Sequence, residues 1–261
     1  MTESSPITHQ TATAEERSAR DADYWARPIS KLTVSSVPAG ATSRNVQGRR
    51  LSSPIHGFGQ MWQKTYRVRL RGAQVAPPEV IRTWKEHFPE FWPTGNAFFA
   101  PLAGIAPGEI ALLTVAPVPG PLKLSTGVLV LYADAESFTL MSPQGHVFAG
   151  WITFSAFQQG GETVAQAQAL IRANDPVYEL GMLLGGSRRE DRFWEHTLRA
   201  LAAHFGVECV VEMRVTCVDR RRQWSRMGNV WFNAAIRSGL YTTASPLRWM
   251  ARPFRRPAPG R

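Results

Sequence analysis

The residues that could do acid–base chemistry lie far apart along the chain and form no recognisable catalytic motif. Four of them would each suit a general acid or base in an apolar cavity, and their spacing singles out none: Glu109, Asp134, His146 and Tyr66. The sequence also lacks a nucleophile elbow, a phosphate-binding loop and a Rossmann glycine pattern. No catalytic residue can therefore be named, and a binding function is favoured over an enzymatic one.

Metal and disulfide chemistry find equally little support. None of the six histidines pairs with Cys, Asp or Glu at a metal-ligand spacing such as HxxxH or CxxC. Cys209 and Cys217 would share one face of an extended strand, roughly 26 Å apart at about 3.3 Å per residue. A disulfide needs Cα atoms about 4–7 Å apart. We therefore expect no metal, no cofactor and no disulfide.

Charge is distributed very unevenly along the chain. Residues 219–261 contain ten Arg and one Asp, a local charge of +9, whereas the rest of the chain is nearly neutral within the total of +10. The N-terminus lacks the apolar core of a signal peptide, and no stretch approaches the roughly 18 apolar residues of a membrane span. These features predict a cytoplasmic protein with a basic tail.

The ends of the chain differ from its middle in composition. Residues 1–30 are rich in Thr, Ser, Ala and charge, which predicts a disordered segment. Residues 31–60 carry Gly, Ser, Pro and Arg and are expected to be an irregular lead-in. A domain is expected over 61–218, followed by a basic, aromatic-rich tail over 219–261.

The first elements of this domain are a strand and a short helix. In MWQKTYRVRL, Tyr66, Val68 and Leu70 alternate with polar residues, which indicates a half-buried strand; Lys64 is the one charged residue on its apolar side. In APPEVIRTWKEHFPEFW, apolar residues at helical spacing predict a short amphipathic helix that Pro89 interrupts.

A long antiparallel meander is expected next. Alternating or β-rich segments separated by short turn signals follow one another over 109–117, 122–134, 136–143, 148–157 and 162–173. In the last of these, Ala165, Ala167 and Ala169 share one face, while Gln166 and Gln168 point the other way. A face of alanines suits close approach by a helix.

That helix is predicted from SRREDRFWEHTLRALAAHFG. Ser187 followed by Glu190 has the spacing of a capping box, an apolar stripe follows at helical spacing, and Gly206 is the expected terminator. The segment 207–218 predicts another strand, added at an edge of the sheet. The predicted order is therefore strand, helix, meander, long helix, strand.

This order resembles the START-like (SRPBCC) superfamily over residues 61–207. The peptides SRNVQGRRL, GFGQMWQKTYRV, SPQGHVFAGWITFSAF and GGSRREDRFWEHTLRALAAHFGV also look like an uncharacterised high-GC bacterial family of this type. The resemblance implies an α+β helix-grip fold, in which an antiparallel sheet wraps around a long C-terminal helix. It also implies a hydrophobic cavity between sheet and helix, in proteins that bind apolar small molecules or act as cyclases.

The cavity hypothesis selects large aromatic residues and a few polar anchors. The aromatic candidates are Tyr66, Trp84, Phe98, Phe99, Phe138, Trp151 and Phe154, and the polar ones are Tyr132, His146, Gln166 and Gln168. Three functions stay open: binding of an apolar or amphipathic small molecule, a cyclase- or hydrolase-like activity in the same cavity, and a ligand-free interaction protein with a filled core.

The basic tail also leaves three alternatives. It could form a helix docked on the domain, an interfacial helix at an anionic membrane, or a nucleic-acid-binding segment, the last being disfavoured. For the membrane alternative, a peripheral position at the inner face of the cell membrane, the contacting residues would be Arg226, Trp231, Phe232, Arg237, Tyr241, Arg248 and Trp249.

Overall fold

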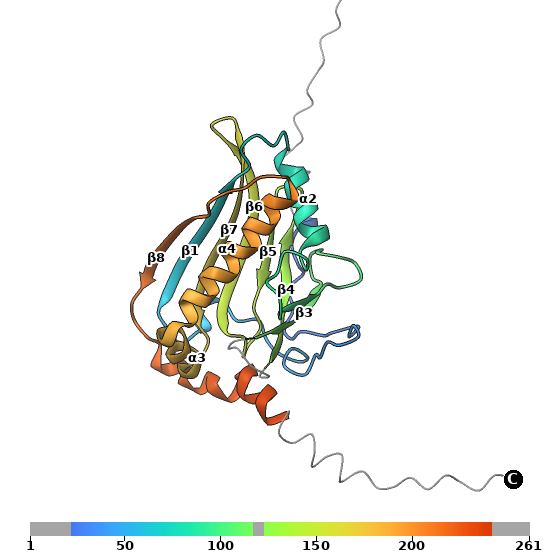
Figure 1. Cartoon of the computed structure of the whole chain (residues 1–261). Helices are drawn as coiled ribbons and strands as arrows, with labels where there is room; N and C mark the ends of the chain where they lie inside the picture. Colours follow the sequence, from blue (N-terminus) through green and yellow to red (C-terminus); the bar gives the residue numbers. More distant parts are fainter. Residues whose placement is uncertain (1–21, 117–122, 242–261) are drawn as a thin grey trace, which may run out of the picture.

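The computed structural model describes residues 22–116 and 123–241, which form one antiparallel sheet curved around a long helix (Figure 1). The eight strands follow the order β2-β3-β4-β5-β6-β7-β1-β8. Their bounds are β1 Met61–Arg69, β2 Ala97–Phe99, β3 Ile110–Val115, β4 Leu124–Ala133, β5 Ser137–Met141, β6 Phe148–Gln159, β7 Glu162–Ala173 and β8 Glu212–Asp219. The meander, the added edge strand and the predicted helix-grip arrangement of sheet and long helix are thus confirmed.

The two longest helices lie on the inner face of the sheet. The elements are α2 Pro77–His87, α3 Pro176–Gly181, a π-type turn η2 Met182–Gly186 and α4 Ser187–His204, with short 3-10 segments η1 Pro54–His56 and η3 Trp224–Phe232. In Figure 1, α4 crosses the sheet from α3 at one end to α2 at the other. It ends in a Schellman motif: Gly206 has φ +71°, and the amides of Gly206 and Val207 donate to the carbonyls of Ala203 and Ala202.

The predicted capping box at the start of α4 is wrong. The chain already has helical dihedral angles at Gly186 and Ser187, because α3 and α4 are joined through η2 with one kink at Gly185, where φ is +108°. Ser187 therefore cannot act as an N-cap, which needs extended backbone. Its hydroxyl accepts a hydrogen bond from Lys64 Nζ at 3.0 Å, and Glu190 pairs with the same ammonium.

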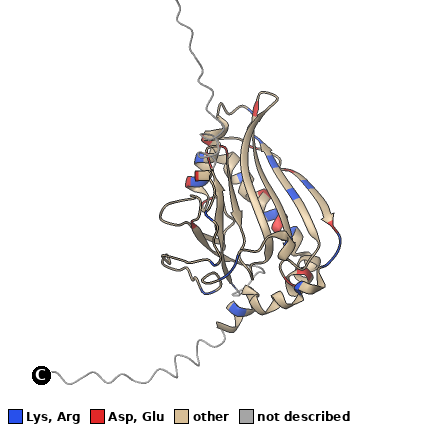
Figure 2. Ribbon diagram, turned by 180° about the vertical axis from the view of Figure 1, so that it is seen from behind, with Lys and Arg blue, Asp and Glu red and all other residues tan. Residues whose placement is uncertain are grey.

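Alternation along the strands separates an apolar inner face from a more polar outer one. Ala165 and Ala167 are fully buried in the same cluster as Leu198 and Leu201 of α4, as the alanine face predicts. On the opposite face, Gln168 Nε2 donates to Thr65 Oγ1 at 3.2 Å. Figure 2 shows this outer side, with Lys and Arg positions along β1 and the edge strand β8.

The N-terminal segment covers part of the outer face. Leu32 and Val46 are buried against Leu112 of β3 and Leu129 of β4, so the irregular lead-in 31–60 supplies a second small core. The segment 1–30, predicted to be disordered, is described from residue 22 onward. Residues 22–30 are placed against β4, where Trp25 forms an isolated bridge with Tyr132 and the ring centroids lie 4.8 Å apart. Composition did not reveal this aromatic pair; residues 1–21 lie outside the described part.

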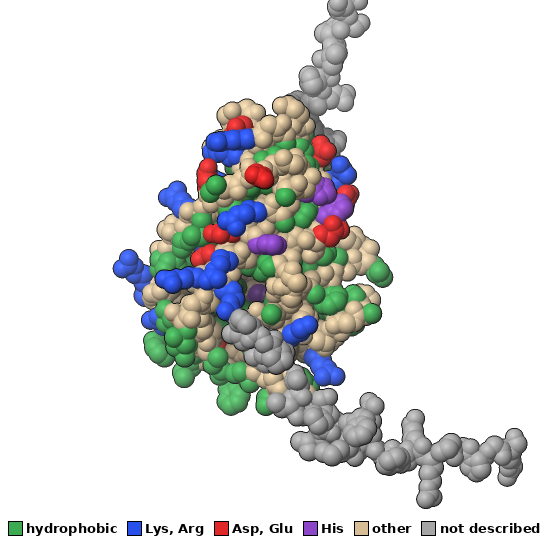
Figure 3. All heavy atoms as spheres, viewed as in Figure 1, with side chains coloured by type: hydrophobic (Ala, Val, Ile, Leu, Met, Phe, Trp, Pro, Cys, Tyr) green, Lys and Arg blue, Asp and Glu red, His purple; other side chains and the backbone are tan. Residues whose placement is uncertain are grey.

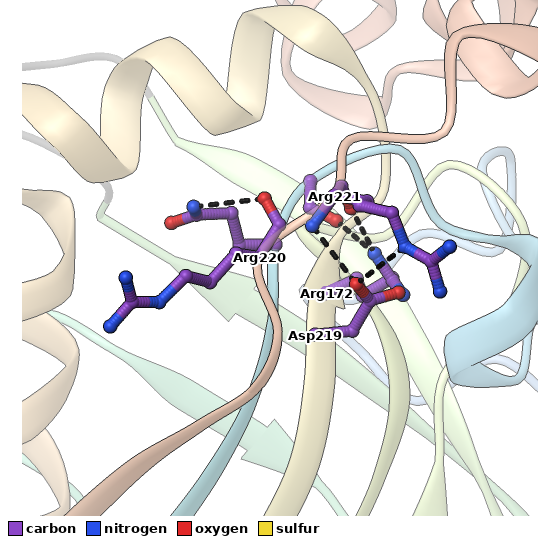
Figure 4. A network of polar contacts seen from close by, with 6 residues as sticks. Arg172, Asp219, Arg220 and Arg221 are labelled. Carbon is purple, nitrogen blue, oxygen red and sulfur yellow. Dashed lines mark hydrogen bonds and ion pairs between the residues drawn. The ribbon is translucent and has the colours of Figure 1, made fainter.

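The first half of the basic tail is docked on the domain. Figure 4 shows its beginning: Arg172 of β7 donates to the carboxylate of Asp219 and to the carbonyl of Arg221. The Arg221 amide N–H donates back to Asp219 at 2.9 Å, and this bond, followed by that of Arg172, lowers the pKa of Asp219 to about 2. Further along, Asn233 Nδ2 donates to the buried Asp175 carboxylate at 2.8 Å. Residues 219–241 therefore belong to the folded body.

Candidate ligand cavity

A cavity of about 230 Å³ lies between the sheet and the N-terminal half of α4. Its walls come from β2 to β7, from the segment after α2, and from η2 and α4. Most of the lining is apolar, and the polar contributors are few: Asn96, Ser142, His146, Arg189 and Glu190. A concave, mostly apolar site with few polar groups is the usual form of a small-molecule site.

The space is hollow because α2 fills only the opposite end of the helix grip. There Trp84 and Phe88 of the α2 region pack edge-to-face against Phe138 and Phe154, with all four rings fully buried. At the cavity end two inner positions of the sheet are small, Gly150 and Ala169. The cavity is thus the part of the inner face that the aromatic rings of the α2 region leave open.

The structure brings three of the predicted binding residues to this cavity. Phe98 and His146 line it directly. Trp151 also borders it, but it alternates with the inner-facing Gly150 and Ile152 on β6, so its ring belongs to the outer face.

The remaining predicted residues do not border this cavity. Tyr66, Trp84, Phe138 and Phe154 are on the inner face as expected, but they fill the packed core and do not border the cavity. Phe99, Tyr132, Gln166 and Gln168 are on the outer face, where Phe99 packs in the second core and Gln166 bonds Arg67. The two glutamines alternate with the alanines that face α4, so the strand period itself excludes them from the cavity.

The helical wall of the cavity was not predicted from the sequence. Glu190, Phe193 and Trp194 border it from one side of α4, at the i, i+3 and i+4 positions that share a helix face. Trp92, just after α2, packs edge-to-face on Phe193 with ring centroids 4.9 Å apart. One feature of the sequence could have indicated this wall. Lys64 is a lone cation on an apolar strand face, and a buried cation requires an acidic partner opposite it.

That partner is a pair of carboxylates on α4. Lys64 Nζ lies 2.7 Å from Glu190 Oε2 and 2.8 Å from Asp191 Oδ1, and only 4% of the Lys64 side chain is exposed. Tyr66 OH donates to the same Asp191 oxygen at 2.7 Å. The network ties β1 to the start of α4 and puts one of its members, Glu190, in the cavity wall.

Burial and neighbouring charges shift the pKa values of the groups in this network. Burial favours the neutral form of Lys64, but the carboxylates of Glu190 and Asp191 outweigh it and raise the lysine pKa above its ordinary value. Burial also raises the pKa of Glu190, and the attraction of Lys64 offsets this only in part. The pKa of Tyr66 is raised first by burial and then by the neighbouring carboxylates. Lysine therefore stays charged, and Glu190 takes up a proton more readily than a free glutamate.

His146 is the other titratable group in the wall. Burial lowers its pKa to about 4, so the ring is neutral at pH 7. Its Nδ1 lies 3.1 Å from the amide nitrogen and 3.3 Å from the carbonyl oxygen of Phe148, so either neutral tautomer has a partner there. No other hydrogen bond of the ring is found within the described residues, which leaves Nε2 for a ligand.

A smaller space of about 90 Å³ adjoins the first. The two share Phe148, Ile171, Met182 and Glu190 in their walls. The smaller one is more polar, since Lys64, Arg172 and Glu179 also border it. Glu190 therefore stands between an apolar compartment and a charged one.

Exposed apolar side chains gather at the end of the molecule where α3, η2 and η3 meet. This surface, called the lower surface below, comprises Leu180, Leu183, Leu184, Trp224, Met227 and Trp231, each more than half exposed. Figure 3 shows hydrophobic side chains over this lower end, and α3 contacts η3. Arg222, which pairs with Glu179, and the exposed Arg226 border it.

Only two of the residues predicted for membrane contact belong to this region. Arg226 is exposed, and 80% of Trp231 is accessible to solvent. The other three described ones contact the body instead: Phe232 lies under Arg49, Tyr241 lies under Arg44, and Arg237 Nε donates to Asn45 Oδ1 at 3.3 Å. Arg248 and Trp249 lie outside the described residues.

Between residues 22 and 241, without 117–122, no three His, Cys, Asp or Glu side chains come together as a metal site. None of the helices in these ranges has the length and apolarity of a membrane span.

The geometry thus defines a helix-grip protein with a mostly apolar cavity under its long helix. No family model matches the chain, and no curated protein matches its sequence significantly. A START superfamily protein from Mycobacterium smegmatis is similar in backbone, with 19% identity and a TM-score of 0.38 over 57% of this chain and 98% of that one. A major latex-like protein from Panax ginseng has 12% identity and a TM-score of 0.34, over 56% and 99% of the two chains.

A third similar structure is the di-domain ARO/CYC StfQ from the steffimycin biosynthetic pathway. It has 11% identity and a TM-score of 0.41, over 57% of this chain and 53% of that one. At these identities the likeness concerns the fold alone.

Proposed function

We propose that this protein binds an apolar or amphipathic small molecule in the cavity between its sheet and α4. The observation that carries the proposal is the cavity of about 230 Å³, with aromatic and aliphatic walls and few polar groups. An apolar space in a protein interior forfeits packing contacts, which an apolar ligand restores. The cavity also argues against the alternative of a ligand-free protein with a filled core.

The test uses pyrene, a neutral hydrocarbon whose fluorescence reports the polarity of its surroundings. We expect the wild-type protein to bind it and Ala169→Leu, which places a larger side chain in the cavity wall, to weaken binding at least about tenfold. Ala165→Leu is the matched control, because Ala165 lies on the same face of β7 but packs in the filled core. Equal affinity of wild type and Ala169→Leu would contradict the proposal.

We also propose that the protein meets an anionic membrane through the lower surface. Aromatic and aliphatic side chains there are exposed beside arginines, and the segment 219–261 carries +9. Tryptophan favours the headgroup region of a bilayer, and each Lys or Arg near an anionic surface contributes about 1 kcal/mol.

Vesicle sedimentation distinguishes binding through this surface from nonspecific adsorption to vesicles. Binding is expected to vesicles containing phosphatidylserine and to be weak for phosphatidylcholine alone. Leu184→Glu and Trp231→Glu should each reduce it severalfold. Leu102→Glu is the control, because Leu102 is 96% exposed but lies in the β2–β3 connection, outside the lower surface. The same loss for all three variants would count against a specific surface.

A second candidate function, a cyclase- or hydrolase-like activity, is favoured by one observation. A carboxyl group and a neutral imidazole, Glu190 and His146, border the same apolar cavity. Groups of this kind serve as general acid and base when their pKa values are shifted by burial. Hydrolysis of p-nitrophenyl butyrate that is lost in His146→Asn, with unchanged pyrene affinity, would support it; absence of turnover by the wild type would exclude this hydrolase form.

A further inference from the structure

The buried network on β1 and α4 contains more negative than positive charge. Lys64 directs hydrogen bonds to Ser187 Oγ, Glu190 Oε2 and Asp191 Oδ1, so its three donors are all used. One ammonium group therefore faces two carboxylates, an excess of one negative charge. A buried excess charge is costly unless a further group of opposite sign compensates it.

The two carboxylates differ in what they face. Asp191 Oδ1 accepts from both Lys64 and Tyr66, and Asp191 borders neither cavity. Glu190 borders both, and it accepts from Lys64 and from the Trp194 side chain. A carboxylate offers about four acceptor positions, so Glu190 retains capacity toward a ligand in the cavity.

Aromatic rings surround the cavity on the side of Glu190. Trp92 lies between Phe98 and Phe193, with ring centroids 5.3 and 4.9 Å away, and Phe193 lies 4.9 Å from Trp194. The faces of such rings attract cations, most strongly when water is excluded. The other charged residue in the wall, Arg189, is solvent-exposed, so its charge is screened.

We propose that the cavity selects ligands that carry a protonated amine, with the cation against the Glu190 carboxylate and the aromatic rings of Trp92, Phe193 and Trp194. This inference rests on the proposed ligand-binding function and specifies the chemical class of the ligand. The apolar remainder of the molecule would occupy the rest of the cavity.

Three compounds of nearly equal shape test the inference by displacement of bound pyrene: cyclohexylmethylamine, cyclohexylmethanol and cyclohexanecarboxylate. We expect the amine to bind at least about tenfold more tightly than the alcohol, and the carboxylate to bind most weakly. Glu190→Gln should abolish the preference for the amine, so that amine and alcohol bind with equal affinity. Asp191→Asn is the matched control: it also removes one carboxylate paired with Lys64, but away from the cavity, and it should retain the preference.

The possible failures are distinguishable. If pyrene does not bind, the proposed function itself is wrong. If pyrene binds but the amine is no tighter than the alcohol, or if Glu190→Gln keeps the preference, only the amine inference is overturned. The wild-type series is decisive even if Glu190→Gln does not fold, which circular dichroism would show.

Discussion

The two ends of the space between sheet and helix are built from the same strands but filled differently. At the α2 end, Trp84 and Phe88 insert between the sheet and α4 and complete a solid aromatic core. At the α3 end, none of the described elements inserts, and a polar network centred on Lys64 holds β1 to α4 beside the cavity. The space between sheet and helix is therefore filled where aromatic packing joins the two layers and open where charge pairing joins them.

The largest expected effect is at the packed end. Trp84→Ala should destabilise the protein by about 3–5 kcal/mol, because it removes a fully buried ring from a core that cannot collapse around the loss. Phe193→Ala, at the cavity end, should cost clearly less, because that side chain is only partly buried and already borders empty space. Urea unfolding of both variants measures the difference; equal costs would contradict the distinction between the two ends.

The next effect concerns the polar network at the cavity end. Lys64→Met should cost about 3–4 kcal/mol, because it leaves two carboxylates without their cation; some solvent access to these groups keeps the cost moderate. The triple variant Lys64→Met, Glu190→Gln, Asp191→Asn should recover most of this loss. Denaturant unfolding of the single and triple variants provides the test, and a triple variant as unstable as the single one would assign the cost to packing instead.

A pH effect of slightly smaller size is expected from His146. Its pKa is about 4 in the folded protein, below the unfolded value of about 6.5, so the unfolded state binds the proton first as pH falls. The contribution of His146 to the free energy of unfolding is therefore fully present above pH 6.5, and it declines by about 3 kcal/mol as the pH falls to 4. His146→Asn, which keeps a partner for the Phe148 backbone, should lack this component when unfolding is followed against pH.

The smallest expected effect gives the most direct comparison of the two ends, because the same substitution, alanine to leucine, is made at two positions on one face of β7. Ala165→Leu should destabilise the protein by about 1–3 kcal/mol through overpacking, whereas Ala169→Leu should change stability by less than about 1 kcal/mol because the cavity accepts the added atoms. Thermal unfolding compares them directly. Similar costs at the two positions would show that the cavity end is as rigidly filled as the other.

Local patterns determined the elements of this protein and their order. Alternation marked the strands, and the bounds of β7 agree with the predicted 162–173, because strand period and turn chemistry depend only on neighbouring residues. The Gly206 terminator has the same local origin. The start of α4 was misassigned because Ser187 and Glu190 have the spacing of a cap, while their actual partner, Lys64, lies 123 residues earlier.

Only the tertiary structure decided where the inner face is filled and where it is hollow. The sequence could place Trp84, Phe138 and Phe154 on the inner face. It could not show that these rings meet one another and leave a cavity beside Ala169. Likewise, the sequence showed Lys64 as a charged residue on the apolar side of its strand, but it did not show that Lys64 pairs with Glu190. A cavity is a relation among side chains from distant segments, and local periodicity carries no information about the distance between them.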